Sequence, residues 1–114
     1  MTMMVNQMTA QLIAVNGSEI CAGLQPENQA HICVSENLPI PLPPNSTIAY
    51  TWTVIHPNGT WRWVSTASER TVPIPWPGDY SVRVQMEYIR QGRRRPFAAF
   101  WTSPLIIHGS DCEG

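Results

Sequence analysis

The segment 76–89 constrains the fold more strongly than any other part of the chain, because its side chains alternate with a period of two. A Pro-Gly pair at 77–78 is followed by apolar or aromatic residues at every second position from Tyr80 to Tyr88. Polar residues such as Arg83 and Gln85 fill the positions between them. Successive side chains of a β-strand point to opposite faces of a sheet, so this pattern predicts a half-buried strand.

A second segment, 48–54, has the same alternation and carries Trp52 at its centre. A large aromatic ring in the middle of an alternating strand is expected to pack inside the protein. Together the two segments predict a hydrophobic core between β-sheets. The residues expected in this core are Tyr50, Trp52, Tyr80, Val82 and Val84.

Further strands are predicted between turn-forming residues along the chain. Residues 18–30 are expected to form a loop or an irregular edge. The Pro-rich stretch 38–45 is expected to run extended at an edge, because proline cannot donate to a β-ladder. An Asn-Gly turn at 58–59 is expected to join two strands of a hairpin. The predicted strands are 11–15, 31–35, 48–55, 60–65, 70–74, one beginning at 80, and a returning strand from about 96 to 108.

The chain is therefore predicted to be all-β, with about seven or eight strands and no helix. Its 114 residues suit one domain, with residues 1–30 as an extension carrying the first strand and 31–108 as the sandwich. A formal net charge of −1 gives no general attraction to nucleic acid or anionic membrane. No apolar run approaches the length of a membrane span, and the first residues do not resemble a secretory signal.

Two short motifs carry a resemblance to a known family. Tyr50-Thr51-Trp52 on one strand and Pro77-Gly78-Asp79-Tyr80 opening another resemble the polycystic-kidney-disease (PKD) and related immunoglobulin-like domains of bacterial surface, secreted or virion proteins. The resemblance implies an antiparallel immunoglobulin-like sandwich, with the Trp in the core. It also implies an adhesion, spacing or scaffold role without catalysis. The chain departs from the family after Trp52, where the segment 56–61 replaces a Gly-Asp-Gly type of turn.

The cysteines and histidines give no pattern of a metal or catalytic site. Cys21, Cys33 and Cys112 match no zinc spacing, and they leave three arrangements open: a 21–33 bridge, a bridge from 112 to the first strands, or three free thiols. The histidines, at 31, 56 and 108, lie on different segments without a nucleophile at a suggestive spacing. We therefore expect no enzyme activity, no cofactor and no metal.

Three tryptophans are candidates for ligand stacking. Trp61 and Trp63 lie two residues apart on a predicted strand and so point the same way, either into the core or outward as an aromatic platform. Trp76 lies between two prolines and is expected to be the more exposed. These residues support an alternative function, a carbohydrate-binding module.

A cluster of arginines and an apolar last strand are candidates for protein contacts. Four of the seven basic residues of the chain, Arg90, Arg93, Arg94 and Arg95, fall at the tip of a predicted hairpin. The strand that follows is apolar on both faces. Phe100 or Trp101, with Ile106 on the side of Phe100, is therefore expected to meet another chain.

These features together predict a non-enzymatic structural or interaction module. The expected setting is a homo- or hetero-oligomeric assembly, such as a virion, an extracellular filament or a surface complex.

Overall fold

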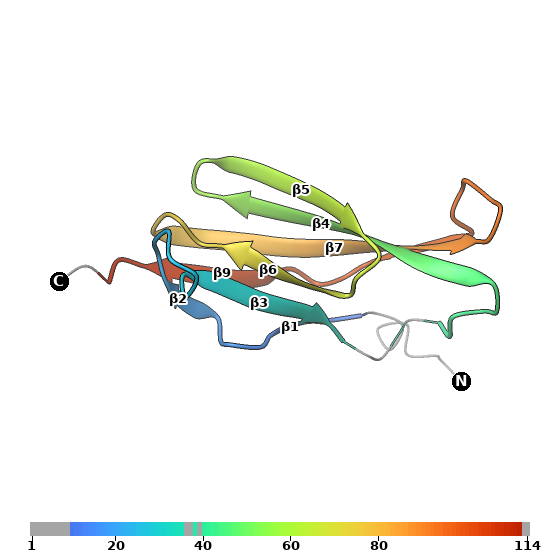
Figure 1. The fold of residues 1–114 in the computed structure, drawn as a ribbon, viewed down its shortest axis with the longest axis horizontal. Coiled ribbons are helices and arrows are strands. Elements are labelled where there is room, and N and C mark those ends of the chain that lie inside the picture. Colours follow the sequence, from blue (N-terminus) through green and yellow to red (C-terminus); the bar gives the residue numbers. More distant parts are fainter. Residues whose placement is uncertain (1–9, 36–37, 39, 113–114) are drawn as a thin grey trace, which may run out of the picture.

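The computed structural model describes residues 10–35, 38 and 40–112, and these form two β-sheets packed face to face (Figure 1). The small sheet has the order β1-β3-β6. The large sheet has the order β2-β9-β7-β4-β5, with β8 also paired to β7. The strands are β1 (Leu12–Ala14), β2 (Glu19–Cys21), β3 (Gln29–Val34), β4 (Ser46–His56), β5 (Gly59–Ser65), β6 (Glu69–Pro73), β7 (Gly78–Arg90), β8 (Ala98–Trp101) and β9 (Leu105–Ser110).

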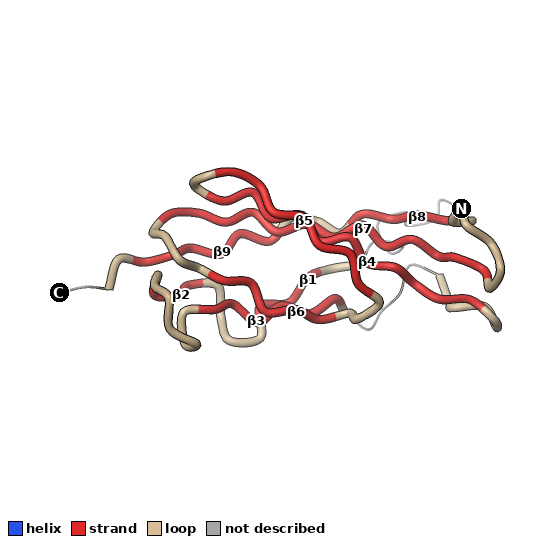
Figure 2. The backbone as a smooth tube through the Cα atoms, turned by 45° about the horizontal axis from the view of Figure 1, so that its top comes forward, coloured by secondary structure: helices blue, strands red, loops and turns tan. Residues whose placement is uncertain are grey.

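The prediction of an all-β, sandwich-like protein is confirmed, since the described residues contain nine strands and no helix (Figure 2). In that part of the chain there is accordingly no helix long and apolar enough to cross a membrane. Neighbouring strands pair antiparallel except at β2, which runs parallel to β9.

Three local predictions are corrected by the structure. Residues 18–30 are not only loop, because β2 lies within them and joins the edge of the large sheet. The returning strand predicted over 96–108 is two strands, β8 and β9. The β4–β5 hairpin turns at Pro57 and Asn58, since His56 pairs with Gly59; Gly59, with a φ of 149°, follows the turn.

Strand β7 organises the large sheet because both of its edges are paired. One edge pairs with β4 over ten positions, and the other pairs first with β9 and then with β8. The inner face of this strand packs against the small sheet. Trp52, Tyr80, Val82 and Val84 are 0% exposed and Tyr50 is 7% exposed. The structure therefore places all five residues of the predicted core inside the sandwich.

An extra residue interrupts the strand that returns along β7. Phe100 pairs with Met86, whereas Leu105 pairs with Val82, so the returning chain uses five steps where β7 uses four. At the interruption Thr102 supplies hydrogen bonds in place of regular strand pairing. Its N–H donates to the carbonyl of Val84, and its Oγ1 accepts the N–H of Val84 at 3.0 Å. An insertion of this kind is a bulge, and it reverses which side chains face the core.

The bulge corrects the predicted geometry of the last strand. Phe100 points inward and packs edge-on against Tyr88, with ring centroids 5.9 Å apart. Trp101 and Ile106 point outward together, with 43% and 49% of their surfaces exposed. Ile106 thus shares a face with Trp101, not with Phe100. The prediction was wrong because it assumed one continuous strand. In such a strand residues 100 and 106 are an even number of positions apart and would point to the same face.

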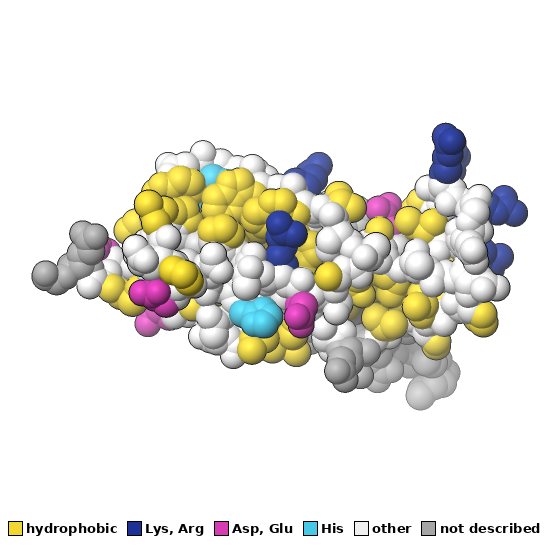
Figure 3. All heavy atoms as spheres, in the orientation of Figure 1, with side chains coloured by type: hydrophobic (Ala, Val, Ile, Leu, Met, Phe, Trp, Pro, Cys, Tyr) yellow, Lys and Arg dark blue, Asp and Glu magenta, His cyan; other side chains and the backbone are white. Residues whose placement is uncertain are grey.

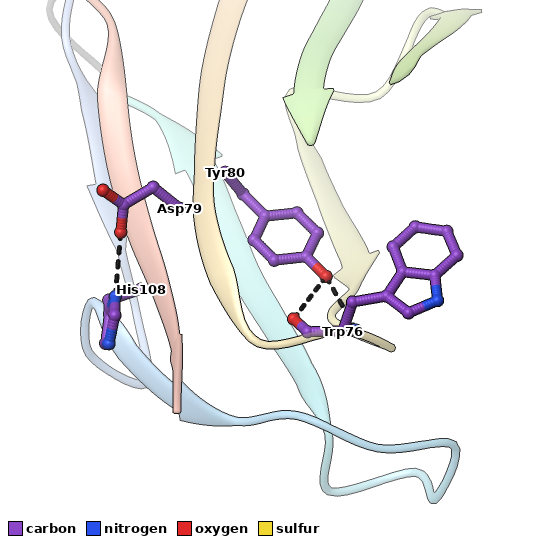
Figure 4. Close-up of polar contacts among 4 residues, drawn as sticks. All are labelled: Trp76, Asp79, Tyr80 and His108. Carbon is purple, nitrogen blue, oxygen red and sulfur yellow. Dashed lines mark hydrogen bonds and ion pairs between the residues drawn. The ribbon is translucent and has the colours of Figure 1, made fainter. Parts of the chain in front are cut away.

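A tyrosine fixes the turn that leads into β7 (Figure 4). The Tyr80 hydroxyl donates to the carbonyl of Trp76 at 2.7 Å and accepts the N–H of the same residue at 2.9 Å. Gly109 on β9 lies directly beneath this turn, where a Cβ would stand 2.7 Å from the Trp76 carbonyl oxygen. The turn can lie this close to β9 only because glycine has no side chain.

The large sheet extends beyond the small one, and a Pro-rich segment covers part of the extension. β4 has eleven residues and β7 thirteen, against six in β3 and five in β6. Leu38 and Ile40 pack on the core, and the buried Tyr88 donates its hydroxyl proton to the Ile40 carbonyl at 2.7 Å. This hydrogen bond fastens the extended segment to the inner face of β7.

A disulfide joins Cys21 on β2 to Cys112 after β9, and Cys33 is a free thiol. Of the three arrangements open from the sequence, this is the bridge from Cys112 to the first strands. The two cysteines are 91 residues apart in the chain, so the bridge links the beginning of the sandwich to its end.

Replacing Trp52 by Ala is expected to lower the free energy of unfolding by about 3–5 kcal/mol, because it empties the centre of the core. Trp52→Phe is the matched control. It should cost less, since the Trp52 Nε1 is buried without a hydrogen-bond partner among the described residues. Urea denaturation of both variants measures this, and a loss below about 1 kcal/mol for Trp52→Ala would contradict this account of the core.

Replacing Cys112 by Ser is expected to lower the free energy of unfolding by about 4–5 kcal/mol, because the bridge restricts a long loop of the unfolded chain. Cys33→Ser is the control and should leave stability nearly unchanged. Denaturation of both variants with and without reductant measures the difference. Equal stability of Cys112→Ser and the wild type would mean that the bridge does not form in solution.

Candidate interaction surfaces

Aromatic rings gather where β4, β5 and the turn before β7 meet. The Trp61 ring lies 4.2 Å from His56, 5.6 Å from Trp63, 5.9 Å from Trp76 and 6.3 Å from Tyr80, between ring centroids. Trp61 and Trp63 share the inner face of β5, as predicted from their spacing, and both are partly buried against the core. Figure 3 shows hydrophobic side chains grouped in the region of β5 and β6.

The faces of these rings are largely occupied by other side chains. The guanidinium of Arg70, on β6, lies 4.1 Å from the centre of the Trp63 ring. The Nε of Arg70 is buried without a hydrogen-bond partner in the described chain, so the ring contact is what holds this group. Trp76 is partly buried against the core, as Trp61 and Trp63 are, and the exposed large aromatics among the described residues are Phe97 and Trp101. This aromatic cluster therefore contributes mainly to the packing of the protein.

The outer face of the large sheet carries exposed apolar side chains. Ile55, Val64, Trp101 and Ile106 are 57%, 69%, 43% and 49% exposed. They lie in two rows across the sheet: Ile55 and Ile106 are the cross-strand neighbours of Ser81, while Val64 and Trp101 lie in one row through Thr51 and Gln85. We call these four residues the outer apolar set. A solvated sheet face is normally polar, so these side chains are candidates for contact with another protein.

A row of longer polar side chains separates the two apolar rows. Thr53 pairs with Arg62 on one side and with Arg83 on the other, and it is only 8% exposed although it lies on the outer face. The Arg83 guanidinium lies 4.4 Å from the centre of the Trp101 ring. The ring thus has a cation–π contact on one of its faces.

Among the described strands, none pairs with the outer edge of β5 in the large sheet. The N–H and the carbonyl of Val84 both bond to Thr102, so the backbone groups of the even-numbered residues of β7 point toward β8 and β9. Those of the odd-numbered residues therefore point toward β4, and the same alternation of an antiparallel ladder continues through β4 to β5. It follows that the backbone groups of Thr60, Arg62 and Val64 point to the open side. The charge of Arg62 on this edge opposes pairing with a second copy of the same strand in the register that would place the two arginines opposite each other.

The arginine cluster lies in the loop between β7 and β8, as predicted, and the loop is anchored at its base. The N–H of Gln91 donates to the Asn45 carbonyl and the N–H of Phe97 donates to the Tyr88 carbonyl. The Arg90 guanidinium lies 5.1 Å from the Phe97 ring centre. Arg90, Arg93, Arg94, Arg95, Pro96 and Phe97 surround a hollow of about 480 Å³. We call residues 90–97 the arginine loop; its four guanidinium groups belong to exposed residues.

The three histidines each lie beside a polar neighbour in the structure. The His56 Nδ1 accepts the N–H of Asn58, and His108 lies 2.8 Å from the carboxylate of Asp79 (Figure 4). His31 lies 4.0 Å from Glu69. Within the described residues no group of three or more His, Cys, Asp or Glu could hold a metal ion.

Comparison with protein-family models, with curated proteins and with solved structures found no match to this chain.

Burial raises the pKa of the phenol groups of Tyr50, Tyr80 and Tyr88 above the ordinary value of 10.0. These are the three tyrosines of the chain. A group whose pKa is higher in the folded than in the unfolded protein stabilises the fold below its unfolded pKa. That contribution is lost as the pH rises through the folded pKa.

We therefore expect the tyrosines to ionise only as the protein unfolds at alkaline pH. A spectrophotometric titration of the phenolate, followed together with near-ultraviolet circular dichroism, tests this. The two signals should change together above pH 10. Ionisation of all three phenols near their ordinary pKa with the dichroism unchanged would contradict the buried positions of these side chains.

Proposed function

We propose that this chain is a non-enzymatic protein-interaction module, a subunit of a larger assembly that contains copies of itself. The observation that carries the proposal is the outer apolar set on the large sheet. Four large apolar side chains on one outward face would be left in water by an isolated domain, and their burial between chains is favourable.

At the level of the fold, we infer an immunoglobulin-like sandwich related to the PKD domains. Its support is the order of the strands: β1, β3 and β6 would correspond to A, B and E, and the large sheet to A′, G, F, C and C′. The parallel pairing of β2 with β9 suits strands A′ and G. Trp52 on the central strand and the hydroxyl of Tyr80 bound to the backbone of Trp76 suit the tryptophan and the tyrosine corner of such domains.

The alternative, a carbohydrate-binding module, has weaker support. Sugar rings stack on free aromatic faces, yet the Trp63 ring is covered by Arg70 and the Trp61 ring has four ring neighbours. Trp76 is partly buried and has His56 beside its ring. The outer apolar set, by contrast, is spread over β4, β5, β8 and β9 across the broad face of the sheet, which suits a protein surface better than a small ligand.

An extracellular, cell-surface or virion location accords with the disulfide between Cys21 and Cys112, because such bridges persist mainly in oxidising surroundings. The low share of charged residues, 13%, accords with a surface that is covered by partners. A nucleic-acid partner is disfavoured because the arginine loop is short and the remaining surface lacks a continuous basic face.

Light scattering coupled to size exclusion tests the proposal, using the wild type and a Trp101→Ser/Ile106→Ser variant over about 1 μM to about 1 mM. The wild type should associate with rising concentration, and the variant should associate at least roughly tenfold more weakly, because it loses two apolar contacts. Val15→Ser, which removes an apolar residue 56% exposed near the small sheet, is the control and should behave as the wild type. A wild type that remains monomeric throughout would overturn the proposal.

A further inference from the structure

Among the described residues, clusters of basic and of acidic side chains lie at opposite ends of the long axis of the molecule. The four arginines of the arginine loop lie at one end, and Figure 3 shows acidic side chains grouped at the other. The acidic end consists of Glu19, Glu27, Asp79 and Asp111, all exposed residues. We call these four residues the acidic end. The other described charged residues, on β5, β6 and β7 between these ends, include both signs.

Strand pairing places Glu19 and Asp79 near each other and far from the arginine loop, and the hydrogen bond from the Asn28 side chain to the Cys21 carbonyl brings the neighbouring Glu27 to the same end. Glu19 pairs with His108, which pairs with Asp79 at the start of β7. The disulfide brings Asp111, next to Cys112, to the same place. Arg90 ends β7, eleven positions after Asp79, so about 35 Å of extended strand separates the two charges. A loop cannot reach the acidic end of its own molecule across this distance.

A preformed hollow lies beside the acidic end, and Asp111 is the one acidic residue among the described residues that line it. Its volume is about 600 Å³, and Leu24, Gln25, Pro75 and Asp111 are among the residues that line it. Buried Asn28 shapes this hollow, because its side chain donates to the Cys21 carbonyl at 2.7 Å and accepts the Gln25 N–H at 2.9 Å.

The walls of this hollow are held on two sides. The Gly23 N–H donates to the Ile74 carbonyl on the neighbouring segment, and the disulfide fixes Cys21. Leu24, at the rim, is 88% exposed, which leaves an apolar side chain available to a partner.

The arginine loop has the charge and the exposure that a partner of the acidic end needs. It projects at the far end of the large sheet, where Figure 1 shows the connection between β7 and β8 standing away from the two layers. Arg93, Arg94 and Arg95 are consecutive and exposed, and the base of the loop is fixed by backbone hydrogen bonds on both sides. Guanidinium groups bind carboxylates through two parallel hydrogen bonds, so this loop suits an acidic partner better than a neutral one.

We propose that the arginine loop of one copy binds the acidic end of a second copy, so that the chains assemble head to tail. This inference rests on the proposed function and names the partner, a second copy, and the two surfaces in contact. The surfaces are different and lie at opposite ends of a molecule 53 Å long, so each bound copy presents its own loop and its own acidic end to further copies. A contact of this type produces open filaments, or rings where the rotation between copies closes.

Reversing the charges tests the contact, with association measured by sedimentation velocity at low and at moderate salt. The loop variant is Arg93→Glu/Arg94→Glu/Arg95→Glu, and the end variant is Glu19→Arg/Glu27→Arg. Each variant alone should associate about 100-fold more weakly than the wild type, because like charges would meet in the contact. Association of the wild type should weaken as salt screens these charges.

An equimolar mixture of the two variants should assemble again. The basic loop of the end variant then meets the acidic end of the loop variant, and the reversed loop meets the reversed end. Recovery in the mixture shows that the two surfaces contact each other, which loss of folding in either variant could not produce. Glu69→Arg, a reversal in the middle of the molecule, is the control and should associate as the wild type does.

The outcomes separate this inference from the proposed function. If the loop and end variants associate as the wild type does while Trp101→Ser/Ile106→Ser does not, head-to-tail assembly is overturned and the interaction module stands. A mixture that stays monomeric would also overturn it. If no form of the chain associates, both proposals fail.

Discussion

The pairing of β7 on both edges, together with burial of its inner face, is the constraint on which the rest of the structure depends. β7 has thirteen residues and pairs with β4 along one edge and with β8 and β9 along the other. Its backbone hydrogen-bonding groups are therefore paired at the centre of the sheet. Its inner side chains meet Trp52 and the small sheet in a core that excludes water. Apolar burial of this kind provides the main driving force for folding, and the ladder satisfies the backbone that becomes buried with it.

The remaining connections attach the chain to this central strand at a few defined points. Tyr80 holds the turn at its beginning, the Tyr88 hydroxyl holds the Pro-rich segment near its end, and Thr102 restores the ladder where a bulge interrupts it. Each uses a side-chain oxygen to satisfy a backbone group that regular strand pairing leaves unpaired. The disulfide then joins the first and last parts of the sandwich, beside the acidic end.

The surfaces follow from the same arrangement. Because β7 runs the length of the molecule, its two ends place the acidic residues and the arginine loop far apart. Because the bulge shifts the parity of the returning chain, Trp101 and Ile106 come together on the outer face, where Arg83 orients the Trp101 ring. One surface is thus apolar and broad, and the other two are charged and opposite in sign. A module that contacts its copies at more than one place would need surfaces of both kinds.

The sequence by itself determined the all-β class, the positions of β4, β5 and β7, and the inward direction of Trp52 and Tyr80, because alternation with a period of two is a local property of a strand. It also indicated the arginine loop, since four arginines lie close together in the chain. Only the tertiary structure decided the rest. The partner of Cys21 and the grouping of Glu19 with Asp79 and Asp111 join residues distant in sequence, the covering of Trp63 by Arg70 joins strands of different sheets, and the direction of Ile106 is set by the bulge. Such contacts depend on strand order and on the bulge at Thr102, and neither is encoded in the periodicity of any single segment.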